Sequence, residues 1–255
     1  FIDDHDSGAI LTSCKLTEGA GIASRGTLTL RDSTIENGGS VSCRAGRATL
    51  TDCSILNGGA LDVWDSGILS ATRCTISGNT RGVESSGQLW LKACTITNNQ
   101  SRETRYGGGL LCSGFAEVVD CTISGNEATA FNCGGGIACF GGTFSLTNCT
   151  IAGNKAGGDG GGLWARGATS LHLTNCTITG NKAGRGGGGF FATMRTSLHL
   201  TNCTIVGNAS SVLGAGVGIE DSDLAITNCI VWGHLGREVW IYETSTAHIA
   251  HSTIA

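Results

Sequence analysis

The sequence predicts a right-handed parallel β-helix, an all-β solenoid of about eleven coils with three short strands in each coil. The first observation is a phrase, Cys-Thr-Ile-x-x-Asn, which begins at Cys74, Cys94, Cys121, Cys149, Cys176 and Cys203. Weaker copies begin at Cys14, Ser33, Cys53, Cys229 and Ser252. The second observation is the spacing, which is about 20 residues as far as Cys94 and about 27 residues beyond it. A period in the twenties is typical of stacked repeats rather than of a compact globule.

The third observation is an alternation of apolar and polar residues inside each repeat. In the repeat at 160–181, for example, Leu171 and Leu173 alternate with His172. Runs of three to five residues with this two-residue period predict strands, because the gaps between them are too short for helices. Each strand is expected to pair with its equivalent one coil further on, about 4.8 Å away.

Two repeated polar residue types are predicted to form ladders through the stack. The chain has 13 cysteines, an odd number that cannot pair completely. Most of them share one repeat position, which favours a buried column of largely unpaired thiols. The second ladder is an inward asparagine that satisfies backbone groups at a bend, formed by Asn79, Asn99, Asn126, Asn154, Asn181 and Asn208, with His234 in its place later.

The whole chain, 1–255, is expected to form a single domain, with short coils over about 1–98 and longer coils over about 99–255. The additional residues of the longer coils fall between the asparagine and a glycine run, in a turn that is a frequent place for binding. The formal net charge of −4 and the absence of a basic run argue against nucleic acid, and no apolar stretch is long enough for a membrane span. We interpret the chain as a piece of a longer protein.

Outward positions of the first strand in each coil carry a column of large side chains. An exposed aromatic column usually marks a contact surface. It is predicted either to stack on sugar rings or to lie beneath the protein's own turns, a partner protein or another copy. The predicted binding surface consists of Trp64, Leu111, Phe140, Trp164, Arg166, Phe191, Trp240 and Tyr242.

Two further outward sets have less specific interpretations. Threonine rows on the third strand resemble the surfaces that bind ice or crystal faces, although threonine is also a favoured strand residue. The rows include Thr75, Thr95 and Thr122. His172 and His199 share an outward position on neighbouring coils, and we interpret them as surface histidines rather than as metal ligands.

An enzyme is the alternative prediction, since β-helices also carry polysaccharide lyases and glycosidases. Hydrolysis of a glycosidic bond needs two carboxyl groups about 5–9.5 Å apart. The best candidates are Asp62, Asp65 and Glu84 on adjacent coils, and no lysine or arginine is predicted to face them. No cofactor is predicted; Ca²⁺ at the acidic opening Asp3, Asp4, His5 and Asp6 has no motif to support it.

The phrases TLTLRDSTIENGG (27–39), SLTNCTIAGNKAGGDGGGL (145–163) and SLHLTNCTITGNKAGRGGGGF (170–190) resemble a known family. It comprises bacterial right-handed β-helix repeat proteins, including polymorphic-outer-membrane-protein-like and choice-of-anchor surface proteins. The resemblance implies an extracellular or cell-surface module with an adhesive or scaffolding role, and it transfers no catalytic residue. Expected partners are a glycan, a protein or, because open coil ends can template pairing, further copies end to end.

Overall fold

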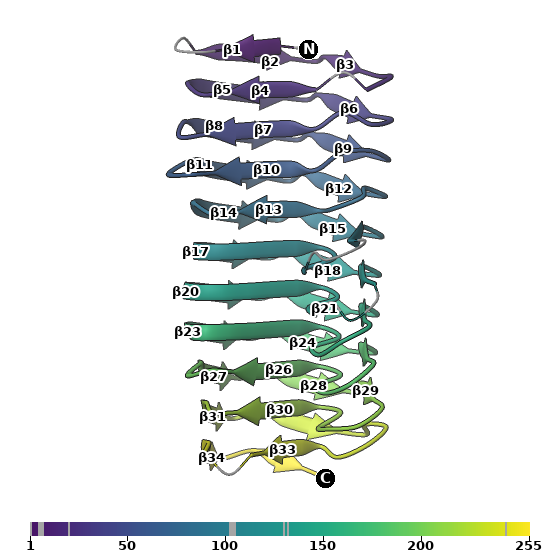
Figure 1. Ribbon diagram of the computed structural model, residues 1–255, viewed down its shortest axis with the longest axis vertical. Coiled ribbons are helices and arrows are strands. Elements are labelled where there is room, and N and C mark those ends of the chain that lie inside the picture. Colours follow the sequence, from purple (N-terminus) through teal and green to yellow (C-terminus); the bar gives the residue numbers. More distant parts are fainter. Residues whose placement is uncertain are drawn as a thin grey trace.

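The protein is a parallel β-helix built from one continuous stack of coils. The computed structural model describes residues 2–4, 8–19, 21–101, 106–129, 131, 133–242 and 244–255. Its strands form parallel sheets of 19, 11 and 5 strands. The 11-stranded sheet takes one strand from each coil, so the described residues contain the eleven coils that the sequence predicted. Figure 1 shows the coils stacked along the long axis, with the two ends of the chain at opposite ends of the stack.

The largest sheet contains the first and second strands of the coils. The separate first strands are β1 (Ile2–Asp4), β4 (Ile22–Ser24), β7 (Val41–Arg44), β10 (Leu61–Trp64), β13 (Val83–Ser85), β26 (Phe190–Thr193), β30 (Val217–Glu220) and β33 (Val239–Ile241). The separate second strands are β2 (Ala9–Thr12), β5 (Thr27–Arg31), β8 (Arg47–Thr51), β11 (Ile68–Thr72), β14 (Gln88–Lys92), β27 (Ser197–Thr201), β31 (Asp223–Thr227) and β34 (Thr246–Ala250).

The longer coils add two details to the predicted three-strand coil. In the middle of the stack the first and second strands are continuous, in β17 (Leu110–Val119), β20 (Ile137–Thr147) and β23 (Leu163–Thr174). From Asn99 to Asn208, the added residues after each ladder asparagine also form a fourth strand of two residues. These strands make the small sheet of β16 (Gln100–Ser101), β19 (Glu127–Ala128), β22 (Lys155–Ala156), β25 (Lys182–Ala183) and β29 (Ala209–Ser210).

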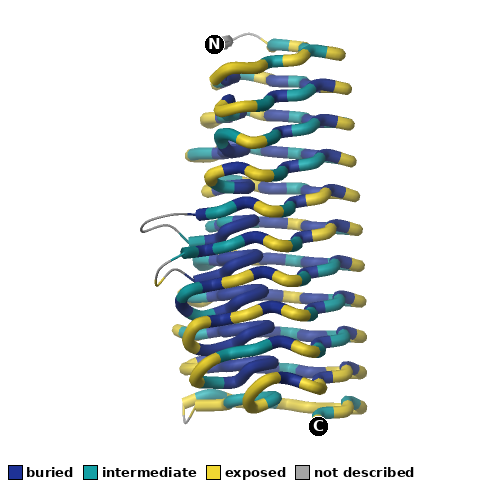
Figure 2. The backbone as a smooth tube through the Cα atoms, turned by 90° about the vertical axis from the view of Figure 1, so that its right-hand side faces the viewer, coloured by how far each residue is buried: buried dark blue, intermediate teal, exposed yellow. Residues whose placement is uncertain are grey.

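The third strands keep one register from end to end. They are β3 (Lys15–Leu16), β6 (Thr34–Glu36), β9 (Ser54–Leu56), β12 (Thr75–Ser77), β15 (Thr95–Thr97), β18 (Thr122–Ser124), β21 (Thr150–Ala152), β24 (Thr177–Thr179), β28 (Thr204–Val206), β32 (Ile230–Trp232) and β35 (Thr253–Ile254). Buried residues recur at the same positions from coil to coil (Figure 2). The isoleucine of the repeated phrase therefore stacks on itself inside, as Ile151, Ile178 and Ile205 do.

The predicted cysteine column is confirmed. The amide of Thr177 donates to the carbonyl of Cys149, and the amide of Thr204 donates to that of Cys176, so these cysteines are equivalents on neighbouring coils. All 13 cysteines are free, and every one except Cys14 is buried. The column is a packing element of the interior rather than a disulfide framework.

The asparagine ladder is confirmed as well. The side-chain amide of Asn154 donates to the carbonyl of Ile123 at 2.9 Å and to Oδ1 of Asn181 at 2.9 Å. The backbone amide of Asn154 donates to the same Oδ1 at 2.9 Å. Each asparagine side chain thus satisfies two backbone groups of the preceding coil in a place that water does not reach, as Asn154 does for the carbonyl of Ile123 and the amide of Asn126. His234 ends the ladder, where its Nδ1 accepts from the backbone amide of Asn208 at 3.0 Å.

Candidate functional site

The outward side of the first strands, here called the first-strand face, carries two columns of side chains. The strand register places Asp62 opposite Glu84, Glu84 opposite Leu111 and Leu111 opposite Ala138. The same register continues this first column through Trp164, Phe191, Gly218 and Trp240. A second column, two residues further along each strand, contains Arg44, Trp64, Ser113, Phe140 and Arg166.

Two members of the predicted surface are not exposed. Trp164 and Phe191 point away from the interior of the β-helix, as expected, but each is only 4% exposed. Together with Cys133 and Ala138 they form a second apolar cluster outside the main core. Of the alternatives open for this column, cover by the protein's own turns therefore holds for these two rings, and they are not part of an exposed binding surface. They are covered because the longer coils carry turns that fold over the first-strand face.

Aromatic contacts show how this cover is built. Tyr106, which precedes a glycine run, stacks on Trp164 with ring centroids 5.1 Å apart and an angle of 8° between the planes. Phe140 meets the edges of both rings at about the same distance. Further along, Gly218 leaves room above it for the ring of Phe191, which a Cβ atom at this position would approach to 2.8 Å. Phe191 then stacks on Trp240 at 6.4 Å.

A pocket opens where this cover begins, and it is called the Trp64–Phe140 pocket below. It has a volume of about 230 Å³ and is lined by Trp64, Glu84, Ser85, Ser86, Leu111, Ser113 and Phe140. Trp64 and Phe140 lie three coils apart, which separates their Cα atoms by about 14 Å. Small side chains at Ser86 and Ser113 leave the space between them open. Three residues of the predicted binding surface, Trp64, Leu111 and Phe140, therefore line one pocket.

A carboxylate pair lies beside this pocket. Asp62 and Glu84 are direct partners on neighbouring strands, and both are at most 9% exposed. Arg81, in the turn before β13, forms an ion pair with Glu84 and approaches Asp62 with Nη2 3.6 Å from Oδ2. The expectation that no basic residue faces these carboxylates is wrong. Sequence reasoning missed Arg81 because its side chain reaches back from a turn, and the only signal was its position three residues before Glu84.

The other predicted site residues lie elsewhere. Asp65 is exposed in the turn that ends β10 and does not join the pair formed by Asp62 and Glu84. Tyr242, 45% exposed, contacts Trp240 at 5.5 Å near the C-terminal end of the stack. Arg166 is half-buried, and its Nε lies 2.9 Å from Sδ of Met194. The predicted surface thus separates into a pocket, a covered cluster and a distant aromatic pair.

The two other outward sets are where the sequence placed them. His172 and His199 stack with ring centroids 4.7 Å apart, and each Nε2 bonds to a serine hydroxyl on the same strand. Burial, and then the neighbouring His199, lower the pKa of His172. The threonine row is in register from Thr75 to Thr204, and Ile230 follows it on β32. The strand register explains why these histidines and threonines stack, and it does not identify a ligand.

Metal ligands and membrane-spanning helices are two other features that bear on function. In the part of the chain that the structure describes, no three histidine, cysteine, aspartate or glutamate side chains lie together in a way that suits a metal ion. The candidate cation site at Asp3, Asp4, His5 and Asp6 lies outside the residues whose side chains are described. Among the described residues there is no helix of the length and apolarity that crossing a membrane requires.

The comparison with protein families agrees with this architecture. The family model described as a right-handed beta helix region matches residues 2–144 and 116–254. The chain belongs to this family. The match confirms the right-handed parallel β-helix that the repeated phrase predicted. A comparison with curated proteins finds no match. Membership in this family establishes a repeat solenoid. A ligand has to be inferred from the geometry of the site.

Proposed function

We propose that this protein is a glycan-binding repeat module of an extracellular or cell-surface protein, and that the Trp64–Phe140 pocket holds a sugar ring. The observation that carries the proposal is the pocket itself, about 230 Å³ in volume, with an aromatic ring at each end and a carboxylate in its lining. Binding sites are typically concave and largely apolar, with a few polar groups that fix the ligand.

The chemistry of the lining suits a pyranose. The C–H faces of a sugar ring are apolar and pack against aromatic faces, such as those of Trp64 and Phe140. Sugar hydroxyls need acceptors and donors, which the Glu84 carboxylate and the hydroxyls of Ser86 and Ser113 supply. The ion pair with Arg81 fixes the Glu84 carboxylate in place, so little rotamer entropy is lost when a ligand binds. A scaffolding role in a larger surface protein is compatible with this proposal.

A glycosidase is the second candidate, because Asp62 and Glu84 are adjacent and Glu84 lines the pocket. In a hydrolase one carboxyl group has to carry the proton that the leaving oxygen receives. Here both carboxylates share the Arg81 guanidinium as an ion-pair partner. This arrangement suits the positioning of hydroxyl groups better than proton donation. We therefore propose binding without cleavage.

The test is binding of a panel of neutral and acidic oligosaccharides to the wild type and to Trp64→Ala. We expect saturable binding that Trp64→Ala weakens by about tenfold or more, as is usual for a buried aromatic contact. The matched control is Trp232→Ala, since Trp232 is 61% exposed on a different sheet. Equal loss in both variants, or release of cleaved sugar products that Glu84→Gln abolishes, would contradict a binding pocket without catalysis.

A further inference from the structure

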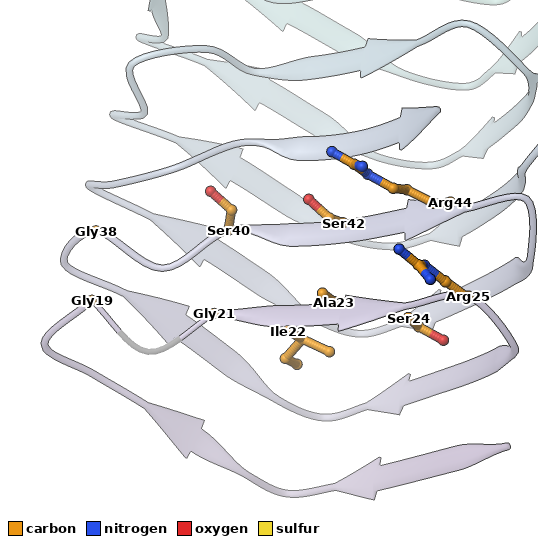
Figure 3. A pocket seen from close by; sticks show the side chains of 10 residues that line it. All are labelled: Gly19, Gly21, Ile22, Ala23, Ser24, Arg25, Gly38, Ser40, Ser42 and Arg44. Carbon is orange, nitrogen blue, oxygen red and sulfur yellow. The ribbon is translucent and has the colours of Figure 1, made fainter. Parts of the chain in front are cut away.

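The short coils leave the first-strand face uncovered on the N-terminal side of the Trp64–Phe140 pocket, and a trough lies there. Its volume is about 440 Å³. The floor is formed by β4 and β7, with the small side chains of Ala23 and Ser42 (Figure 3). The turns at Gly19 and Gly38 lie along one side. The lining consists of Gly19, Gly21, Ile22, Ala23, Ser24, Arg25, Gly38, Ser40, Ser42 and Arg44.

Two arginines dominate the opposite side of the trough. Figure 3 shows the side chains of Arg25, directly after β4, and of Arg44, at the end of β7, extending in the same direction. Both are exposed, and in the described part of the chain neither forms an ion pair or a side-chain hydrogen bond. Two like charges side by side repel each other, and a bound anion relieves this repulsion. Guanidinium groups present several N–H donors in a plane and match the geometry of carboxylate and similar oxyanions.

Hydroxyl groups complete the donor set. Ser40 and Ser42 project from the floor on the same side as the guanidinium groups (Figure 3). The Ser40 oxygen accepts from the backbone amide of Ala60 at 3.2 Å, which leaves its proton to be donated. Along the first column the strand register places Asp3 before Ala23 and Asp62 after Ser42, and Asp62 is already engaged by Arg81. The trough therefore offers donors to a ligand without a competing free carboxylate in its lining.

The trough and the Trp64–Phe140 pocket are neighbours along the stack. Arg44 and Trp64 are direct partners on β7 and β10. The second column then runs from Arg25 through Arg44, Trp64, Ser86 and Ser113 to Phe140, a span of six coils or about 24 Å. A linear chain of sugar rings lying along the stack would meet two cationic positions first and the aromatic pocket next.

We propose that the trough binds the carboxylate or sulfate groups of an acidic polysaccharide, through Arg25 and Arg44 and with the help of the Ser40 and Ser42 hydroxyls. The extension of the same polysaccharide into the Trp64–Phe140 pocket rests on the proposed function. The ligand is anionic although the chain itself has a formal net charge of −4, so the contact depends on these local donors and not on overall attraction.

The test is calorimetric titration with three oligosaccharides of equal length: an oligogalacturonate, a sulfated glycosaminoglycan fragment and a neutral oligosaccharide. The variant is Arg25→Gln with Arg44→Gln. We expect it to bind the acidic oligosaccharides about tenfold more weakly or worse, the order expected for lost charge-assisted hydrogen bonds, and to bind the neutral one as the wild type does. The control variant, Arg31→Gln with Arg195→Gln, makes the same change in net charge at two exposed positions outside the trough and should bind all three unchanged.

The outcomes separate the two proposals. Unchanged affinity for acidic oligosaccharides in the Arg25 and Arg44 variant, or an equal loss in the control variant, would overturn the anion site. An oligonucleotide is titrated into the wild type as a further probe. If it binds more tightly than either acidic oligosaccharide, the anion site for polysaccharides is overturned too. If acidic oligosaccharides bind through the arginines while no ligand depends on Trp64, the anion site stands and the aromatic pocket fails. If the neutral oligosaccharide alone depends on Trp64, the aromatic pocket stands and the anion site fails.

Discussion

The thiol of each cysteine in the interior column donates to the backbone carbonyl two residues earlier. Cys176 does so to Thr174 at 3.3 Å, and Cys53 to Thr51 at 3.2 Å. Ser33 occupies the same repeat position and donates to the carbonyl of Arg31 at 2.7 Å. The position therefore requires a small side chain with one donor. This explains why the repeated phrase contains either cysteine or serine at its first residue.

This account predicts different costs for two substitutions at Cys176. Cys176→Ser keeps the donor, so the carbonyl of Thr174 stays satisfied, and the free energy of unfolding should fall by less than about 1.5 kcal/mol, the order of one net hydrogen bond. Cys176→Val removes the donor and adds a branched side chain to a packed column, which typically costs about 1–3 kcal/mol. Urea unfolding of both variants measures the difference. A serine variant that is less stable than the valine variant would show that packing alone selects the residue.

The asparagine ladder is the element that locks the corner between the third strand and the next coil. Its end differs from its middle, because His234 replaces asparagine and is 8% exposed. Burial lowers the pKa of the His234 imidazole, and the nearby Glu238 carboxylate, with Oε2 3.3 Å from Nε2, opposes that shift. Nδ1 accepts a hydrogen bond from Asn208, so a second proton on the ring would break that contact.

The ladder end is therefore predicted to be sensitive to acid. Since the folded-state pKa of His234 is lowered, the unfolded chain takes up a proton first as pH falls below about 6.5, and this part of the stability is lost between pH 7 and pH 5. His234→Asn restores a ladder residue that does not titrate and should reduce the loss. Thermal unfolding at the two pH values measures it. The control, His248→Asn, changes an exposed imidazole outside the ladder. A loss as large in His234→Asn as in the wild type would contradict the explanation.

The change in coil length organises the whole molecule. The short coils leave the first-strand face open over Arg25 and Arg44, and the longer coils fold turns across it and cover Trp164 and Phe191. The Trp64–Phe140 pocket lies at the boundary between these two parts. A uniform coil length would give either an open face or a covered one, but no such boundary.

The fold could be predicted from sequence because its determinants are local and repeated. Alternation along one strand and a fixed period place Ile151, Ile178 and Ile205 in one file without knowledge of any long-range contact. Which rings are covered could not be predicted in the same way, since the cover of Trp164 comes from a turn more than 50 residues earlier, which contains Tyr106. Arg81 was missed for the same reason, because its contacts depend on how a turn returns to the face.

The most direct test of the proposed site uses the five tryptophans as reporters. In a nitrogen–proton correlation spectrum each indole N–H gives one signal, and these signals can be followed during titration with the oligosaccharide that binds best. We predict that the Trp64 signal moves and saturates, while the signals of the buried Trp164 and of Trp232 on β32 stay in place. Movement of the Trp232 signal with no change at Trp64 would contradict a glycan site on the first-strand face.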